Sequence, residues 1–199
     1  MFPFFESIRF TNDVAENLFF HQQRVERTFQ HYGQSCKLDL LEIDFQAEAA
    51  TIGELKEIVF KCRIQYDLLG NYQISFTPYQ IRKIHSFSFF EIGSQDYPIK
   101  LSDRTWINEA VKSVDTDDLV FVKQGVLKDA SYANIVLFDG KDWVTPASPL
   151  LFGTMRAKLL NEKKIIEREI SIDQLKNYRT IKFINAMMTW EESPTIELR

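Results

Sequence analysis

Glycine and cysteine are scarce in this chain of 199 residues, which contains 7 glycines and 2 cysteines. Low glycine excludes a collagen-like or linker-rich chain, because both depend on the conformational freedom of that residue. The two cysteines, Cys36 and Cys62, are too few for a disulfide framework or a cysteine-based metal cluster. We therefore expect two reduced thiols in a cytoplasmic protein.

An excess of positive charge and a long apolar segment are also missing. The net charge of −4 gives no basic footprint for nucleic acid. No apolar run approaches the roughly 18 residues needed to span a bilayer. Glu6 and Arg9 interrupt the short apolar amino terminus, which argues against a signal peptide. We therefore expect neither nucleic acid nor a membrane as a partner. The apolar fraction of 45% suits a globular protein with a buried core.

The hydrophobic pattern predicts a mixture of short helices and strands. Helices are expected at 17–32, 52–69, 103–114, 153–161 and 172–176. Strands are expected at 4–10, 72–76, 81–92, 118–124, 133–138, 141–145, 165–170 and 180–187. In the helix expected at 52–69, Leu55, Cys62 and Tyr66 would share one face. The polar segment 92–98 reads as a linker, so the pattern predicts an α+β protein with two domains, 1–93 and 97–199.

The most specific pattern lies in the carboxyl-terminal half. Asp129 precedes a turn of small residues, Asn134 then begins a strand, and a Thr-Pro turn leads to a Gly-Thr-x-Arg helix start at 153–156. This order resembles that of class IV aminotransferases, the pyridoxal-phosphate enzymes of fold type IV. The resemblance implies a small amino-terminal α/β sandwich and a carboxyl-terminal domain with a barrel-like sheet. It also implies pyridoxal 5'-phosphate in a cleft between them.

The segment YPIKLSDRTWINEA, residues 97–110, resembles the part of the family that carries the cofactor lysine. The resemblance makes Lys100 the catalytic residue. Its amine would condense with the cofactor aldehyde and, once released, move a proton at the substrate α-carbon. An arbitrary lysine is most often a solvated surface charge. The family context is what favours the catalytic interpretation of Lys100.

The resemblance also places Asp129 against the pyridine nitrogen of the cofactor. Family members usually carry Glu here, and an acid at this position keeps the ring nitrogen protonated so that the ring accepts electrons. Asp is one methylene shorter than Glu, so the backbone would have to approach the ring more closely. The alternative is an ordinary turn residue in Lys-Asp-Ala-Ser.

Several residues are expected to bind the cofactor phosphate. The His-x-x-Arg segment at 21–24 resembles a family motif whose Arg grips the phosphate with two parallel charge-assisted bonds. Gly153 and Thr154 open a helix whose N–H groups would form an anion seat. The alternatives are that Arg24 pairs with a nearby carboxylate and that Gly153 is an ordinary loop glycine.

Three further residues complete the cofactor-binding set that the resemblance implies. Asn134 precedes a strand in the family order, and Asn185 with Ala186 matches a phosphate-side turn.

Arg9 either lines the active-site wall or forms a salt bridge at the end of its strand. His21 is expected to be a packed structural histidine, because it lies on the apolar side of its helix.

The function implied is that of a 4-amino-4-deoxychorismate lyase, which forms p-aminobenzoate and pyruvate on the way to folate. Compactness favours it, since the resembling lyases are the shorter family members. The implied mechanism is amine exchange at Lys100, proton abstraction by Lys100, loss of pyruvate and aromatisation. One alternative is an aminotransferase for branched-chain or D-amino acids. Another is a non-catalytic dimeric remnant, which the shortened amino terminus motivates. A homodimer is expected, because sites in this family lie at a subunit interface.

Overall fold

The computed structural model describes residues 2–51 and 59–198. The chain forms two compact units. Unit 1 comprises Met1–Ile81 with Ile99–Asp103, and unit 2 comprises Arg82–Pro98 with Arg104–Arg199. Lys100 therefore belongs to the unit built from the amino-terminal segments. The predicted domain ranges, 1–93 and 97–199, stay a prediction.

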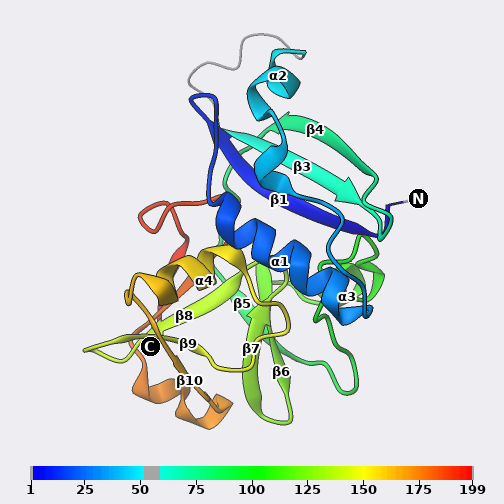
Figure 1. Cartoon of the computed structure of the whole chain (residues 1–199). Coiled ribbons are helices and arrows are strands. Elements are labelled where there is room, and N and C mark those ends of the chain that lie inside the picture. Colours follow the sequence, from blue (N-terminus) through cyan, green and yellow to red (C-terminus); the bar gives the residue numbers. More distant parts are fainter. Residues whose placement is uncertain (1, 52–58, 199) are drawn as a thin grey trace. The chain divides into compact units, whose positions relative to one another are not determined.

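Unit 1 is a four-stranded antiparallel sheet that carries helix α1 (Figure 1). The strand order is β2-β1-β3-β4. Its elements are β1 (Phe4–Thr11), β2 (Val14–Ala15), α1 (Leu18–His31), η1 (Leu40–Glu42), α2 (Phe45–Ala50), β3 (Phe60–Tyr66) and β4 (Tyr72–Pro78). The helix expected at 17–32 is confirmed as α1, and the strand expected at 72–76 is confirmed as β4.

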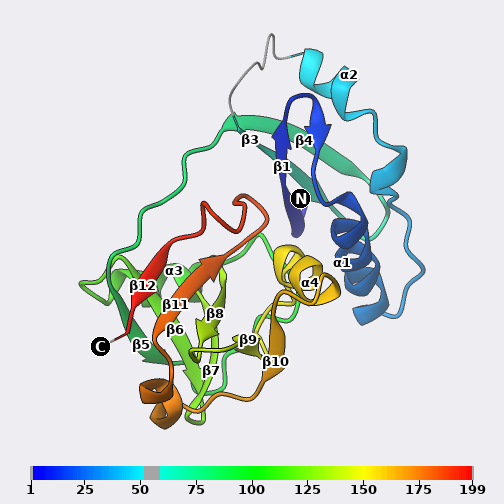
Figure 2. The same ribbon diagram turned by 90° about the vertical axis from the view of Figure 1, so that its left-hand side faces the viewer.

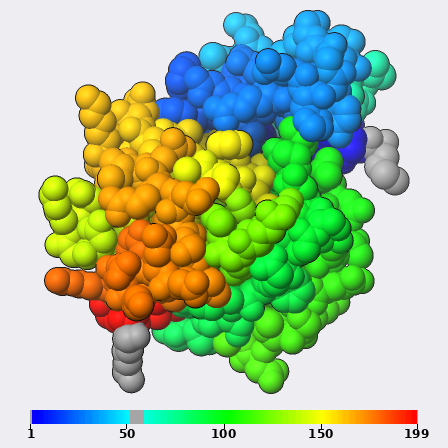
Figure 3. All heavy atoms as spheres, turned by 90° about the horizontal axis from the view of Figure 1, so that it is seen from below, coloured from blue at the N-terminus to red at the C-terminus, as the bar shows by residue number. Residues whose placement is uncertain are grey.

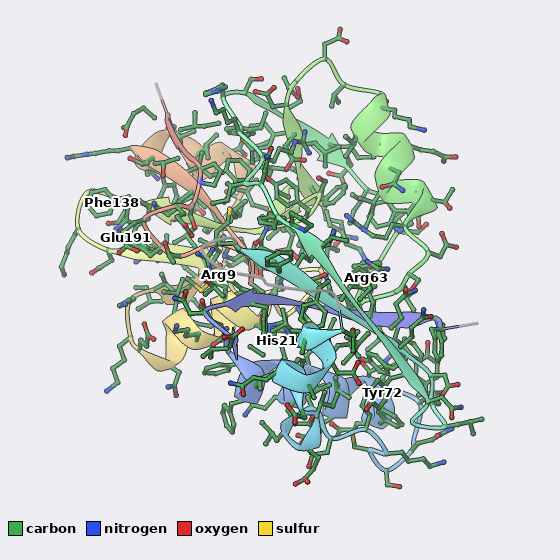
Figure 4. All side chains as sticks on the ribbon, turned by 90° about the horizontal axis from the view of Figure 1, so that it is seen from above. Arg9, His21, Arg63, Tyr72, Phe138 and Glu191 are labelled. Atoms are coloured by element: carbon green, nitrogen blue, oxygen red, sulfur yellow. The ribbon has the colours of Figure 1, made fainter. Side chains whose placement is uncertain are left out.

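The two faces of this sheet differ in character, because successive side chains of a strand point to opposite sides. On β1, Phe4, Ile8 and Phe10 join a buried apolar core with Val25 and Phe29 of α1. The intervening residues of β1 and β3 form the opposite face, which is more polar. Figure 4 shows His21 on the helix side of the strands and Arg63 on the other side.

The helix expected at 52–69 is wrong where the structure describes it. Residues 60–66 form β3, whose side chains alternate between buried and half-buried. Cys62 and Tyr66 are four residues apart, a spacing that suits one face of a helix and one face of a strand equally well. Pairing with β1 and β4 decides in favour of the strand. The part of the expected helix at 52–58 lies outside the described residues.

Unit 2 contains two sheets (Figure 2). The larger has the order β10-β9-β8-β11-β12, and the smaller has the order β5-β6-β7. The strands are β5 (Phe87–Glu91), β6 (Asp118–Lys123), β7 (Val126–Ala130), β8 (Asn134–Phe138), β9 (Trp143–Pro146), β10 (Ile166–Arg168), β11 (Thr180–Ile184) and β12 (Thr195–Glu197). The helices are α3 (Thr105–Lys112), α4 (Thr154–Asn161) and the 3₁₀ helix η2 (Ile172–Asn177). Neither sheet closes into a barrel among the residues that the structure describes.

The predicted α+β class is confirmed, and most elements of unit 2 lie where the pattern placed them. Two strands were missed, β7 and β12. The sequence of β7, VLKDA, contains Lys128 and Asp129, which are uncommon in strands and obscure the pattern. The strand expected at 81–92 is shorter, and only Phe87–Glu91 is extended and paired, in parallel with β6.

The short helix η2 lies at the surface of unit 2, where Figure 3 shows it in orange. The side chain of Ser171 and that of Gln174 cap it reciprocally, and none of its residues is buried. Among residues 2–51 and 59–198, no helix has the length and hydrophobicity to cross a bilayer. The same residues contain no group of three or more side chains that could hold a metal ion.

Candidate functional site

Lys100 is held beside the first strand of unit 1. The amide of Phe5 donates to the carbonyl of Lys100 at 3.2 Å, and Leu101 forms a β-bridge with Phe4. The amide of Ser102 donates to the carbonyl of Pro3 at 2.7 Å. The half-buried Lys100 amine lies 4.5 Å from the centroid of the Phe5 ring. The backbone of the predicted cofactor lysine is therefore fixed to the sheet.

On the helix side of the same strand, three side chains form a buried polar cluster. Glu6 is fully buried, and its Oε1 accepts from Arg24 Nε at 2.9 Å. Its Oε2 accepts from Arg24 Nη2 at 2.5 Å and lies 2.5 Å from His21 Nδ1. Arg24 therefore does pair with a carboxylate, as its alternative interpretation held, but it is buried rather than at the surface. His21 is completely buried, as expected for a structural histidine.

The charges in this cluster are strongly coupled. Burial alone would raise the pKa of Glu6, but the Arg24 charge and the His21 hydrogen bond lower it to about 2. Burial lowers the pKa of His21, against the effect of the hydrogen bond with Glu6. The charges of Arg24 and Lys100 lower the pKa of His21 further. Lys100 therefore lies close enough to influence this cluster.

We expect acid to destabilise the protein through Glu6. Its folded pKa of about 2 lies below its usual value of 4.5. The ionised Glu6 therefore adds roughly 3 kcal/mol to the free energy of unfolding. This contribution is present above about pH 4.5 and is lost as the pH falls toward 2. The check is the free energy of unfolding measured between pH 7 and 3 for the parent and for Glu6→Gln. Glutamine does not titrate, so the variant should lose less stability over this range; equal slopes would contradict the assignment.

In unit 2, Asp129 is a buried strand residue. It lies in β7 and is 5% exposed, so its interpretation as an ordinary turn residue is wrong. Its Oδ1 accepts from Asn134 Nδ2 at 2.7 Å, and its Oδ2 accepts from the amide of Leu151 at 2.8 Å. Burial raises the pKa of Asp129 to about 6, although these two hydrogen bonds act in the opposite direction. A positively charged partner would offset the cost of burying this carboxylate.

Asn134 links Asp129 to the loop that precedes α4. Its Nδ2 also donates to the carbonyl of Leu151 at 2.9 Å. A Cβ atom placed on Gly153 would lie 1.9 Å from Asn134 Oδ1, so only glycine fits beside this asparagine. The structure thus gives Gly153 a specific role that differs from close approach to a phosphate. Asn134 thus contacts both Asp129 and Gly153, so the positions of these three residues depend on one another.

The start of α4 has the features of an anion seat. Gly153 precedes the helix in extended conformation and, as a glycine, brings no side chain of its own to cap the helix. The first turn carries no acidic residue. Thr154 is the first residue of the helix and is buried. The helix N–H groups and the positive end of its dipole therefore favour an anion.

The Arg of the Gly-Thr-x-Arg motif ties α4 to the neighbouring strands. Arg156 is 3% exposed, and its Nη2 donates to the carbonyl of Pro146 at 2.9 Å and to Glu167 Oε1 at 2.6 Å. Its charge also lowers the pKa of Asp129. Arg156 therefore orients the helix start on which the anion seat depends.

Asn185 and Ala186 form a turn directly after β11. Asn185 Oδ1 accepts from the amide of Met187 at 2.8 Å, and its Nδ2 donates to the carbonyl of Tyr132 at 3.4 Å. Tyr132 lies in the β7–β8 connection, a few residues beyond Asp129. Both Asn185 and Ala186 are half-buried. The side chain of Asn185 thus connects this turn to the segment that carries the acid.

The structure brings the predicted site residues together in two groups. Lys100 and Arg24 lie in unit 1, and the remaining six, Asp129, Asn134, Gly153, Thr154, Asn185 and Ala186, lie in unit 2. Arg9 forms the strand-end salt bridge that was one of its two interpretations, with Nε 3.2 Å from Glu16 Oε1. Sequence reasoning missed Glu6. The available signal was the strand alternation, which puts Glu6 on the same face as the apolar Phe4 and Ile8. A carboxylate on a buried face requires a cationic partner.

Both the sequence and the fold are similar to those of known proteins. Residues 99–191 match the amino-transferase class IV family. An uncharacterized protein of Haemophilus influenzae is 34% identical over 188 residues, which cover 94% of this chain and 98% of that protein. A crystal structure of a proposed 4-amino-4-deoxychorismate lyase from Haemophilus somnus 129PT is 36% identical, with a TM-score of 0.85. The match covers 94% of this chain and 97% of that one, so this relative shares the compact length.

More distant structures show the same fold. A hypothetical aminotransferase from Mycobacterium tuberculosis in its PLP-bound form has a TM-score of 0.75 at 15% identity, over 98% of this chain and 80% of that one. The fold and the sequence relationships together define a fold type IV protein. The chain belongs to the class IV aminotransferase family.

Proposed function

We propose that the protein is a pyridoxal-phosphate-dependent 4-amino-4-deoxychorismate lyase that forms p-aminobenzoate and pyruvate. The observation that carries the proposal is the similarity to the Haemophilus somnus protein over nearly the whole length of both chains. The tethered Lys100 and the buried Asp129 support it, because each is the chemical group that such a reaction requires.

The residues present fit the cofactor. Asp129 is a buried acid whose pKa burial raises to about 6, and a protonated ring nitrogen beside it would favour its charged form. The start of α4 offers N–H groups to a phosphate. Arg24 uses two of its nitrogens on Glu6, and a guanidinium has five N–H donors, so it retains donors for an anion. Asn134, Gly153, Asn185 and Ala186 then shape the segments around these groups.

Bound pyridoxal phosphate supplies an aldehyde that condenses with amines and a ring that accepts electrons. Lys100 would hold this group through its amine and, once the substrate amine replaces it, would take the proton from the carbon that bears the substrate amine. Asp129 would keep the proton on the ring nitrogen. Loss of the substrate proton and cleavage of the bond between the ring carbon and the ether oxygen would make the six-membered ring aromatic. The enolpyruvate that leaves would become pyruvate by taking up a proton, which the Lys100 ammonium can return. The N–H groups at the α4 start would bind the phosphate, and Arg24 is a candidate donor to an anion in unit 1.

A class IV aminotransferase acting on branched-chain or D-amino acids is the second candidate, because the matching family is named for aminotransferase activity. The two reactions share their first steps at Lys100. We expect purified protein to release pyruvate from 4-amino-4-deoxychorismate and to leave a panel of amino acids with 2-oxoglutarate unchanged. Turnover of the amino acids alone would establish the aminotransferase. A colourless protein inactive in both assays would favour the non-catalytic alternative.

Arg24→Ala is expected to weaken cofactor binding by roughly 1.5–3 kcal/mol, the usual value of a charge-assisted hydrogen bond. The measurement is a cofactor titration followed by visible absorbance. Arg27→Ala removes the same charge from an exposed position of the same helix and should leave the affinity unchanged. Because Arg24→Ala leaves Glu6 buried without its partner, the titration is made only where circular dichroism shows folded protein. Unchanged affinity in that sample would contradict the phosphate role.

A further inference from the structure

Asn134 lies between the buried acid of unit 2 and the loop that leads into α4. Its Nδ2 donates to Asp129 Oδ1 at 2.7 Å and to the carbonyl of Leu151 at 2.9 Å. A side-chain amide has two N–H hydrogens, so these two acceptors use both of them. Its Oδ1 lies against Gly153, where an added Cβ atom would be 1.9 Å away. Asn134 therefore has no N–H left with which to bind a phosphate.

Leu151 is held at both of its peptide groups. Its amide donates to Asp129 Oδ2 at 2.8 Å, and its carbonyl accepts from Asn134. Asp129 is 5% exposed and Asn134 is 7% exposed, so a broken bond here would leave a buried polar group unpaired. Only two residues separate Leu151 from Thr154, the first residue of α4. A change in the position or charge of Asp129 therefore reaches the start of the helix.

We propose that Asn134 is a positioning residue that couples the two ends of the cofactor, so that binding beside Asp129 and binding at the α4 start strengthen each other. This inference rests on the cofactor of the proposed function and deepens it. A protonated ring nitrogen beside Asp129 favours the ionised carboxylate. An ionised carboxylate accepts stronger hydrogen bonds from Asn134 and Leu151 than a neutral acid does. Those bonds order the loop before an anion arrives, which lowers the entropy cost of binding the anion.

The coupling acts equally in both directions, because it is a difference in binding free energy. An anion at the α4 start would hold Gly153 in place and, through Asn134, would hold the hydrogen bonds of Asp129. A merely structural asparagine would change the stability of the fold and would weaken both ends alike. It would not make the affinity at one end depend on occupation of the other. That dependence is the quantity that separates the two roles.

The test measures the binding of pyridoxine to the full-length protein without its cofactor, in the presence and absence of inorganic phosphate. Pyridoxine carries an alcohol in place of the aldehyde, so it forms no bond with Lys100. Its dissociation constant is measured by equilibrium dialysis, with sodium chloride at matched ionic strength as the reference. Saturating phosphate should tighten pyridoxine binding to the parent protein by at least about 5-fold, and this factor should fall to about 1 in Asn134→Ala.

Thr145→Val is the matched control. Thr145 is also buried, and its Oγ1 donates to the carbonyl of Ile135, the residue after Asn134, at 2.9 Å. The substitution removes a buried hydrogen bond beside Asn134 and leaves the bonds of Asn134 in place, so the factor of the parent should remain. Asn134→Ser replaces the alanine variant if that variant does not fold. A serine hydroxyl supplies one donor in place of two, so the coupling should also be lost.

The outcomes separate the inference from the proposed function. The inference is overturned if the parent binds no pyridoxine or binds it equally with and without phosphate. It is also overturned if the factor persists in the Asn134 variant or is lost equally in Thr145→Val. Coupling through Asn134 in a protein that does not turn over 4-amino-4-deoxychorismate would leave the inference standing and overturn the lyase. Turnover of that substrate without coupling would overturn the inference and leave the lyase standing.

Discussion

Asp129→Asn is expected to lower turnover by at least about 100-fold while leaving the fold and most of the bound cofactor in place. A carboxylate holds the proton on the pyridine nitrogen through a charge-assisted bond, and an amide does so poorly. Only proton removal at the substrate depends on the protonated ring. The measurement is turnover per bound cofactor. Full activity of the Asn variant would show that Asp129 only anchors Asn134 and Leu151.

The same substitution has a stability signature in cofactor-free protein. Since burial raises the pKa of Asp129 to about 6, the folded state favours the protonated acid. The protonated acid adds roughly 3 kcal/mol to the free energy of unfolding. This contribution is fully present below the usual pKa of 3.8 and is lost as the pH rises through about 6. The Asn variant should lack this loss in unfolding measurements between pH 4 and 8. A parallel dependence in both proteins would contradict the raised pKa.

Asp129→Glu tests whether the site requires the shorter acidic side chain. Both carboxylate oxygens of Asp129 are held within 2.8 Å of their donors, so the site fits the shorter side chain. An added methylene should crowd the Leu151 loop and lower activity despite the retained charge. Activity equal to the parent would show that the site merely tolerates Asp.

Gly153→Ala is expected to destabilise the protein by about 2–4 kcal/mol. The added methyl would lie 1.9 Å from Asn134 Oδ1, so Asn134 would have to rotate and abandon Asp129 and Leu151. The backbone of Gly153 has φ −70° and ψ 147°, which alanine adopts without strain. The effect therefore isolates the contact with Asn134. Cofactor affinity should fall with stability, because the displaced loop leads into α4.

A second substitution makes this test specific. Asn134→Ala removes the colliding atom, so the double variant Asn134→Ala/Gly153→Ala should be about as stable as Asn134→Ala alone. Gly125→Ala is the control: its added methyl meets no atom within 4 Å, and its cost comes from a φ of +75°. That cost should add to the effect of Asn134→Ala. Additive effects for Gly153→Ala as well would contradict the proposed coupling.

The sequence predicted much of the fold because many elements carry one unambiguous period. Leu18, Val25 and Phe29 recur only at helical spacing, and the helix at 17–32 is found. The error at 60–66 arose where Cys62 and Tyr66 satisfy both periods, and only pairing with distant strands resolves that ambiguity. β7 was missed because Lys128 and Asp129 hide a strand whose stability comes from β6.

The residues of the candidate site stay a prediction, and their contacts could be predicted from the sequence only in part. The order of motifs that resembles the family pointed to Asp129 and Gly153. It could not show that Asn134 contacts both, because that contact forms only when a strand and a distant loop fold against each other. Likewise, Arg24 was expected to bind an anion, whereas Glu6 already holds two of its nitrogens.

The central claim is that Lys100 carries the cofactor. Its most direct test is borohydride reduction of the purified protein with its cofactor, followed by proteolysis and mass spectrometry of the labelled peptide. We predict a single pyridoxyl group on Lys100 and no labelled peptide in Lys100→Arg, with Lys61→Arg as a control that keeps the label. A label on another lysine, or none in a protein saturated with pyridoxal phosphate, would contradict the account.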